Sequence, residues 1–176
     1  MEVGLILDRL KQQFGERIVG ADLEAADPWI EIAPAALAEV ARLLRDDPAL
    51  RFDYLHCITG VDYVQPDAKK AKSFPWEVHF ELLYHLSSMT HGHRLVLRVT
   101  LPRWQGGVEG QLPEVRTVSD VWRTADWHER EVYDLSGVRF AGHPDLRRIL
   151  CPEDWEGHPL RKDYKTAEEY HGIRTR

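Results

Sequence analysis

The sequence predicts an α+β domain: a two-layer sandwich with helices on one face of a mostly antiparallel mixed sheet, followed by an extended C-terminal arm. Helical hydrophobic patterns lie near the N-terminus and again after residue 116, and strand patterns with a period of two lie between them. After His143 no periodicity remains, and prolines and glycines interrupt a polar, aromatic-containing tail. We therefore expect a single domain over residues 1–142 and an arm over residues 143–176.

The N-terminal elements follow from spacing and from proline and glycine positions. Apolar residues recur at helical spacing from Val3 to Phe14, and Gly15 is suited to cap that helix. Short extended segments at residues 17–19 and 29–32 predict two edge strands. Pro34 then begins a helix whose apolar stripe is Leu37, Val40, Ala41 and Leu44, and which ends at residues 46–48.

Three strands are expected next. Residues 52–61 are mostly apolar on both faces, which is typical of a central, well-covered strand. Residues 76–84 and 95–101 alternate between apolar and polar, and the loop at 87–92 is short enough to join them as an antiparallel hairpin. Residues 65–75 contain three lysines and two prolines and are expected to form a mobile surface loop.

Two helical segments are expected after the sheet. Thr117 begins a stretch in which Val118, Val121 and Trp122 have helical spacing. Asp126, with Glu129 three residues later, predicts a capping box at the start of a second helix. Gly137 is expected to end that helix.

Composition argues against several classes of function. The net charge of −6 disfavours general nucleic-acid binding. No segment approaches the roughly 20 apolar residues that span a bilayer, and the N-terminus lacks the basic region of a signal peptide. We therefore expect a protein on the cytosolic side that reaches a membrane only through partners. Cys57 and Cys151 belong to no C-x-x-C pair, so neither a self-contained iron–sulfur cluster nor a zinc ribbon is expected.

The segment from Trp127 to Tyr164 has the most informative composition. On a helix, Glu131 and Asp134 would share a face with Trp127, and Arg130 could reach Asp134 across one turn. Such a face could be a metal site, a catalytic carboxylate pair, a salt-bridged docking surface or simply a solvated helix face.

Docking is the interpretation that accounts for most of this segment. The histidines lack zinc-binding His-x-x-x-His spacing, the carboxylates have arginines beside them, and neither a nucleophile elbow nor a phosphate loop is present. A solvated helix does not explain two His-Pro turns, Arg147-Arg148 and Trp155 in an arm without a core of its own. We expect the arm to be poorly protected in the isolated chain and to become ordered on a partner.

The same segment resembles the signature of the C subunit of NADH–quinone oxidoreductase, respiratory complex I. The matching residues cover about a fifth of the chain: Glu129-Arg-Glu-Val-Tyr-Asp134, Gly137, Phe140-Ala-Gly-His-Pro-Asp-Leu-Arg-Arg-Ile-Leu150 and Pro152-Glu-Asp-Trp-Glu-Gly-His-Pro-Leu-Arg-Lys-Asp-Tyr164. Two positions depart from the family pattern. Ser136 stands where phenylalanine is expected, at the end of the predicted helix, and Lys165 replaces a proline at the start of the last residues.

The resemblance implies a structural subunit in the peripheral arm of a proton-translocating complex, on the cytoplasmic side of the cell membrane. It implies no catalytic, cofactor-binding or metal-binding residue in this chain, since flavin, iron–sulfur clusters and quinone belong to partner subunits. The implied partners are the quinone-site D subunit and neighbouring iron–sulfur subunits. The residues expected to face partners are Glu129, Arg130, Glu131, Asp134, His143, Pro144, Arg147, Arg148, Trp155, His158, Arg161, Lys162 and Tyr164.

Other assignments stay open at the level of sequence. The chain could be the equivalent subunit of a related membrane-bound hydrogenase or of a ferredoxin- or F420H2-linked complex. A stand-alone enzyme using the Glu- and His-rich segment and a general adaptor outside respiration are further alternatives.

Overall fold

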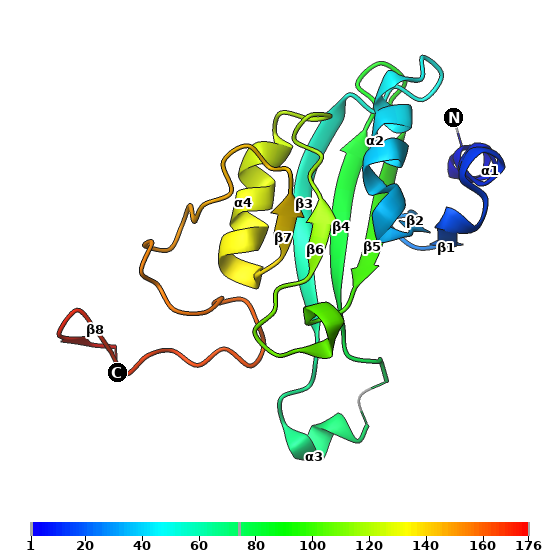
Figure 1. The fold of residues 1–176 in the computed structure, drawn as a ribbon. Coiled ribbons are helices and arrows are strands. Elements are labelled where there is room, and N and C mark those ends of the chain that lie inside the picture. The colour runs from blue at the N-terminus through cyan, green and yellow to red at the C-terminus, as the bar shows by residue number, and fades with distance from the viewer. Residues whose placement is uncertain (1, 74, 176) are drawn as a thin grey trace.

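The computed structural model describes residues 2–73 and 75–175 and contains a five-stranded sheet with helices against one face (Figure 1). The strand order is β1-β2-β5-β4-β3, and only the β2–β5 pair is parallel among these neighbours. The strands are β1 (Ile18–Asp22), β2 (Trp29–Ile32), β3 (Tyr54–Tyr63), β4 (His79–Ser87) and β5 (Arg94–Leu101). The predicted α+β class with a mostly antiparallel mixed sheet is confirmed.

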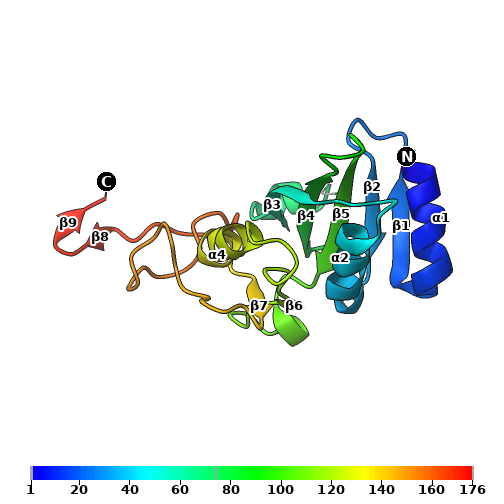
Figure 2. The same cartoon turned by 90° about the horizontal axis from the view of Figure 1, so that it is seen from above.

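Three longer helices contribute to the core: α1 (Val3–Phe14), α2 (Leu37–Asp46) and α4 (Ala125–Ser136). In Figure 2, α1 lies beside β1 at one end of the sheet, α2 lies over its middle, and α4 lies at the β3 end. Gly15 ends α1 at a φ of 54°, as its sequence position predicts. Pro34 opens a 3₁₀ turn, Pro34–Ala36, that leads into α2. None of the helices in the described ranges is long and apolar enough to cross a membrane.

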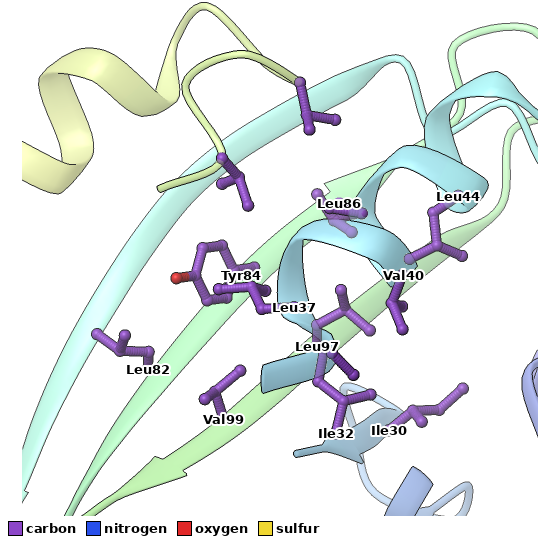
Figure 3. Packing of buried hydrophobic residues seen from close by; sticks show 14 of the residues in the cluster. Ile30, Ile32, Leu37, Val40, Leu44, Leu82, Tyr84, Leu86, Leu97 and Val99 are labelled. Carbon is purple, nitrogen blue, oxygen red and sulfur yellow. The ribbon is translucent and has the colours of Figure 1, made fainter. Parts of the chain in front are cut away.

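The core lies between α2 and the sheet (Figure 3). The predicted stripe of α2 is fully buried, and it packs against alternate residues of the strands below it. Those alternate strand residues include Ile30, Ile32, Leu82, Tyr84, Leu86, Leu97 and Val99. This alternation is the period of two that the sequence shows for β4 and β5.

The strand expected at the centre of the sheet is instead its edge. β3 pairs with β4 alone in the described sheet, and α4 packs on it. The apolar run at residues 52–61 that suggested a doubly covered strand begins with Phe52, which precedes β3 and is fully buried in the core. The alternation of β4 also begins later than predicted, because Trp76 and Val78 are 55% and 59% exposed and lie before the strand.

Residues 117–122 form a turn and not the expected helix. The chain enters this turn from β6 (Glu114–Arg116), which pairs in parallel with β7 (Arg139–Ala141). The Thr117 hydroxyl then accepts a hydrogen bond from the Ser119 N–H, and Val118 donates its N–H to Glu129. These local side-chain bonds compete with a helical path.

The predicted capping box at Asp126 is also absent from α4. The N-cap residue is Thr124, and its side chain makes no capping bond in the described structure. Glu129 does not serve as the second member of a capping box, because its carboxylate accepts hydrogen bonds from the Thr117 hydroxyl and the Val118 N–H. The expected C-terminal stop is confirmed: Gly137 adopts the left-handed conformation, with φ 71° and ψ 52°.

Two small elements lie in segments that are predicted to be a loop and an extended arm. The loop at residues 65–75 contains the one-turn helix α3 (Ala68–Ala71). The arm ends in a hairpin of β8 (Glu169–Tyr170) and β9 (Ile173–Arg174). This hairpin lies at the opposite end of the molecule from α1 (Figure 2).

Candidate docking site: helix α4 and the C-terminal arm

Asp134 on α4 holds the first part of the arm in place. Its fully buried carboxylate accepts the N–H groups of residues 149–151 at 3.0, 2.7 and 2.8 Å. Arg148 Nη1 donates to the same carboxylate at 2.6 Å. Burial acts to raise the pKa of Asp134, but the Cys151 N–H, the Arg148 guanidinium and the other two N–H groups outweigh it and lower the pKa to about 2. The carboxylate is therefore ionised and fully partnered.

Arg148 joins that contact to the next turn of the arm. Its Nη2 donates to the carbonyl oxygens of Trp155 and Gly157, each at 2.8 Å. One planar guanidinium thus binds the Asp134 carboxylate on α4 and two carbonyl oxygens of the arm. These bonds hold residues 148–157 in a bend against the helix.

Arg161 makes a second attachment, at the C-terminal end of α4. Its guanidinium donates to the carbonyls of Ser136 and Gly137 at 2.9 Å each and to that of Arg103 at 3.3 Å, and the residue is 5% exposed. It also lies 3.8 Å from the centroid of the Trp104 ring. The last carbonyls of a helix have no intrahelical N–H donor, and Arg161 supplies donors to two of the carbonyls at the end of α4. Burial lowers the pKa of Arg161 to about 10.

A buried ion pair extends this attachment to the sheet. Arg103 binds Asp62 of β3 through two bonds, at 2.8 and 3.0 Å, and Asp163 of the arm at 2.6 Å. The N–H of Lys162 donates to the same Asp62 carboxylate at 3.0 Å. The arm is thus bonded to the domain at both ends of residues 148–163.

Glu129 and His143 lie where the arm leaves the domain. Glu129 is fully buried, with the Thr117 hydroxyl and the Val118 N–H as donors. Burial raises the pKa of Glu129 to about 7 in spite of those two bonds. The buried His143 ring places Nε2 3.9 Å from the Glu129 carboxylate and 3.1 Å from the Asp126 carbonyl.

The end of the arm folds back on itself. Asp154 accepts hydrogen bonds from the Tyr170 hydroxyl and from His171, both at 2.8 Å. The Trp155 and Tyr170 rings are 5.0 Å apart between centroids. Trp155 is therefore half-buried by the β8–β9 hairpin of its own chain.

The residues predicted to face partners separate into two groups. Those with bonds inside the chain and little exposure are Glu129, Arg130, Asp134, His143, Arg148, His158 and Arg161. Those at the surface are Glu131, Pro144, Arg147 and Lys162, with Trp155 and Tyr164 half-buried. The expected pair between Arg130 and Asp134 does not form. Arg130 donates instead to the carbonyls of Arg147 and Arg148, and the Arg148 guanidinium donates to the Asp134 carboxylate.

Three residues that complete the attachment of the arm were not predicted from the sequence: Asp62, Arg103 and Asp163. A signal was present for Asp62, because it shares the alternate, covered positions of β3 with Ile58 and Gly60. A carboxylate at a covered strand position requires a partner, and Arg103 is that partner.

The family is identified by comparison of the whole chain with known proteins. Residues 30–170 match the family model of the respiratory-chain NADH dehydrogenase 30 Kd subunit. The C subunit of NADH-quinone oxidoreductase from Chlorobium phaeobacteroides is 41% identical over 169 residues, which are 95% of this chain and 91% of that protein.

Two solved structures share the fold. A trypsin-resistant fragment (1-134) of Nqo5 has a TM-score of 0.59 and 28% identity, covering 83% of this chain and all of that one. A chain of the membrane-bound sulfane sulfur reductase, an archaeal respiratory membrane complex, has a TM-score of 0.69 at 21% identity over 94% of this chain and 86% of its own. The second likeness concerns the fold alone. The match to the family model and the identity to a C subunit over nearly its full length establish that the chain belongs to the family of the 30 kDa subunit of respiratory-chain NADH dehydrogenase, which confirms the resemblance seen in the sequence.

Proposed function

We propose that this chain is a structural, cofactor-free subunit of the peripheral arm of a proton-translocating NADH–quinone oxidoreductase, on the cytoplasmic side of the cell membrane. Its α4 and arm dock on the quinone-site D subunit and on neighbouring iron–sulfur subunits. The observation that carries this proposal is the 41% identity to a C subunit of that enzyme over 91% of the relative's length.

Two features of the site support a docking role. The charged side chains of α4 and the arm mostly bind backbone groups of the same chain, so they shape a surface and leave few groups free for chemistry. Among the residues with a described position, no group of three or more His, Cys, Asp and Glu side chains is arranged to hold a metal ion. In this proposal flavin, iron–sulfur clusters and quinone are bound by partner subunits.

A second assignment shares the same mechanical role. The fold extends to a chain of an archaeal respiratory membrane complex with a TM-score of 0.69. The second assignment is the equivalent subunit of a related membrane-bound hydrogenase or of a ferredoxin- or F420H2-linked complex. The 41% identity favours the NADH–quinone enzyme.

Co-purification tests the proposal directly. An affinity tag on this chain, with the complex extracted from membranes in mild detergent, is expected to recover the quinone-site subunit and the iron–sulfur subunits together with NADH–quinone activity. Recovery of hydrogenase subunits would favour the second assignment. Recovery of the chain without respiratory subunits would contradict both.

A further inference from the structure

Glu129 is a buried carboxyl group to which no cation is bonded. Its side chain is fully buried on α4 and contacts the Thr117 hydroxyl and the Val118 N–H. Among the basic side chains that the structure describes, only His143 comes close enough to form an ion pair, with Nε2 at 3.9 Å. A buried carboxylate is costly unless a cation or several hydrogen bonds compensate it, so this position favours the protonated acid.

The other titratable groups around Glu129 also oppose a negative charge there. Burial raises the pKa of Glu129 most, and the negative charges of Asp120 in the preceding turn and of Asp126 on α4 raise it further. Tyr84 of β4 is the group on the sheet side, and its buried hydroxyl has no hydrogen-bond partner among the described residues. Burial, and then the charge of Glu129, raise the pKa of Tyr84 well above its usual range, so Tyr84 stays neutral.

A chain of hydroxyl groups links Glu129 to the surface and fits both of its protonation states. The Thr117 hydroxyl oxygen accepts the Ser119 N–H at 3.1 Å and lies 2.8 Å from the Ser119 hydroxyl oxygen. Thr117 has one hydroxyl proton, so it donates either to Glu129 or to Ser119. When Glu129 is protonated, its O–H donates to Thr117 and Thr117 donates to Ser119; when Glu129 is ionised, both donations reverse. Ser119 is partly exposed, so one proton passes from Glu129 through Thr117 and Ser119 to water, and Glu129 keeps the negative charge.

His143 lies against Glu129 at the point where the arm begins. Its ring is fully buried, and Nδ1 accepts the Asp145 N–H at 3.0 Å. A ring nitrogen that accepts an N–H carries no proton, so the ring proton is on Nε2, which donates to the Asp126 carbonyl at 3.1 Å. His143 is therefore neutral in this arrangement and does not balance the charge of an ionised Glu129.

We infer that Glu129 is a proton-binding site that controls the start of the arm, because loss of its proton breaks the bond between His143 and Asp145. Two routes relieve the ionised carboxylate, and both break that bond. If His143 takes up a proton on Nδ1, it becomes a cation, but Nδ1 no longer accepts the Asp145 N–H. If the ring turns away, water reaches Glu129 and Nδ1 moves away from Asp145. The bonds of Asp134 hold residues 149–151 in both states, so only the start of the arm is released.

Amide hydrogen exchange in the isolated full chain, followed by NMR, tests this inference. The readout is the exchange rate of the Asp145 amide divided by that of the Leu150 amide, which donates to Asp134 at 2.7 Å. This division removes the base catalysis common to all amides and any change in global stability. We compare pH 6 and pH 8, on either side of the Glu129 pKa of about 7. If the open state lets Glu129 ionise at its ordinary pKa of 4.5, the ratio should rise by up to about tenfold.

Three variants complete the test. Glu129→Gln never ionises, and its amide can donate to Thr117 as the protonated acid does, so its ratio should stay constant with pH. Glu131→Gln changes an exposed glutamate of the same helix and should show the wild-type rise. Thr117→Val removes a donor from the ionised carboxylate, so the rise should move to higher pH. Thr117→Val keeps the inference testable if Glu129→Gln does not fold.

Several outcomes would overturn the inference. A constant ratio in the wild type would show that ionisation does not open the start of the arm, and an equal rise in Glu129→Gln would assign the opening to another group. Infrared spectroscopy is an independent check, because the wild type at pH 6 should show the C=O band of a protonated carboxylic acid that Glu129→Gln lacks. Absence of that band would remove the bound proton and the inference with it. The subunit role is tested separately, by co-purification, and does not depend on these results.

Discussion

Two buried carboxyl groups on α4 respond to pH in opposite directions. The pKa of Asp134 is lowered from 3.8 to about 2. Its ionised form therefore stabilises the fold at every pH above 3.8, and that stabilisation is lost only as the pH falls towards 2. The pKa of Glu129 is raised to about 7, so the folded protein binds a proton that the unfolded chain releases near pH 4.5. Stability from Glu129 is therefore fully present below pH 4.5 and is lost as the pH rises through 7.

Glu129→Gln is expected to remove part of the pH dependence of stability. The amide keeps an acceptor for the Val118 N–H and carries no charge at any pH. Between pH 5 and pH 8 the wild type should lose up to about 3 kcal/mol of unfolding free energy that the variant keeps. Denaturant unfolding at both pH values measures the difference. Glu131→Gln, an exposed substitution on the same helix, is the control and should match the wild type; equal pH slopes for Glu129→Gln and wild type would contradict the prediction.

At the scale of elements, α4 is placed by small residues at its C-terminal end. A Cβ atom on Gly60 of β3 would lie 2.9 Å from the Phe80 ring and 3.2 Å from the Ser136 hydroxyl. Ser136, which departs from the family pattern, is thus a small residue at a close approach of helix and strand, and it is 3% exposed. The helix end is well packed with serine at this position.

Gly137→Ala is expected to destabilise the protein by more than its backbone conformation requires. Its φ of 71° alone costs an alanine roughly 1–2 kcal/mol, and the added Cβ would lie 2.5 Å from the His158 ring. Gly106→Ala is the matched control, because Gly106 has a φ of 61° and no atom within 4 Å of the added Cβ. Unfolding free energies of the two variants should differ by the cost of displacing the His158 turn. Equal losses of unfolding free energy in the two variants would contradict the prediction, because they would show that the His158 turn moves away from the added Cβ without a free-energy cost.

The arm itself is expected to be ordered in part before any partner binds. The sequence predicts poor protection throughout residues 143–176, whereas the bonds to Asp134 and Arg161 favour slow exchange at residues 149–151 in the isolated chain. Hydrogen exchange followed by mass spectrometry measures this, with the C-terminal hairpin as a fast-exchanging internal reference. Asp134→Ala should release the three amides. Fast exchange at 149–151 in the wild type would show that the attachment forms only in the complex.

At the scale of the whole molecule, the subunit role predicts that mutations change assembly and leave turnover intact. Arg148→Ala leaves the buried Asp134 without its cation. A fully buried pair costs about 3–5 kcal/mol to break, and this pair should cost less because the Arg148 side chain is 15% exposed and Asp134 keeps three N–H donors. Glu131→Ala acts at an exposed position and should have a smaller effect. Both variants should lower the amount of assembled complex on native gels, with NADH–quinone activity per complex near normal. Full assembly with lost turnover would instead place chemistry in this segment.

The isolated chain is predicted to be colourless and free of bound metal. Cys57 and Cys151 are both free thiols, and a cluster or zinc site needs about four ligands. Elemental analysis and the visible spectrum of the purified protein measure this. Stoichiometric iron or zinc that disappears in Cys57→Ala or Cys151→Ala would contradict the prediction.

Local patterns predicted the elements that depend on near neighbours. The helix at residues 3–14 with Gly15 as its stop, the proline-led start before α2, the hairpin of β4 and β5 and the stop at Gly137 were all predicted correctly. Each depends on periodicity or on a glycine or proline within about one or two turns. The position of β3 at the sheet edge and the parallel pairing of β6 with β7 were missed, because both depend on residues that are distant in the chain.

By itself, the sequence determined the α+β class, the α4–arm segment as the informative region and the family to which the chain belongs. The tertiary structure decided which charges of that segment are internal and which are free. Arg161 is buried because it reaches carbonyls of residues 103, 136 and 137, and the N–H of Lys162 binds a carboxylate 100 residues earlier. Whether a charged side chain faces a partner depends on which distant groups satisfy it first, and no local pattern contains that information.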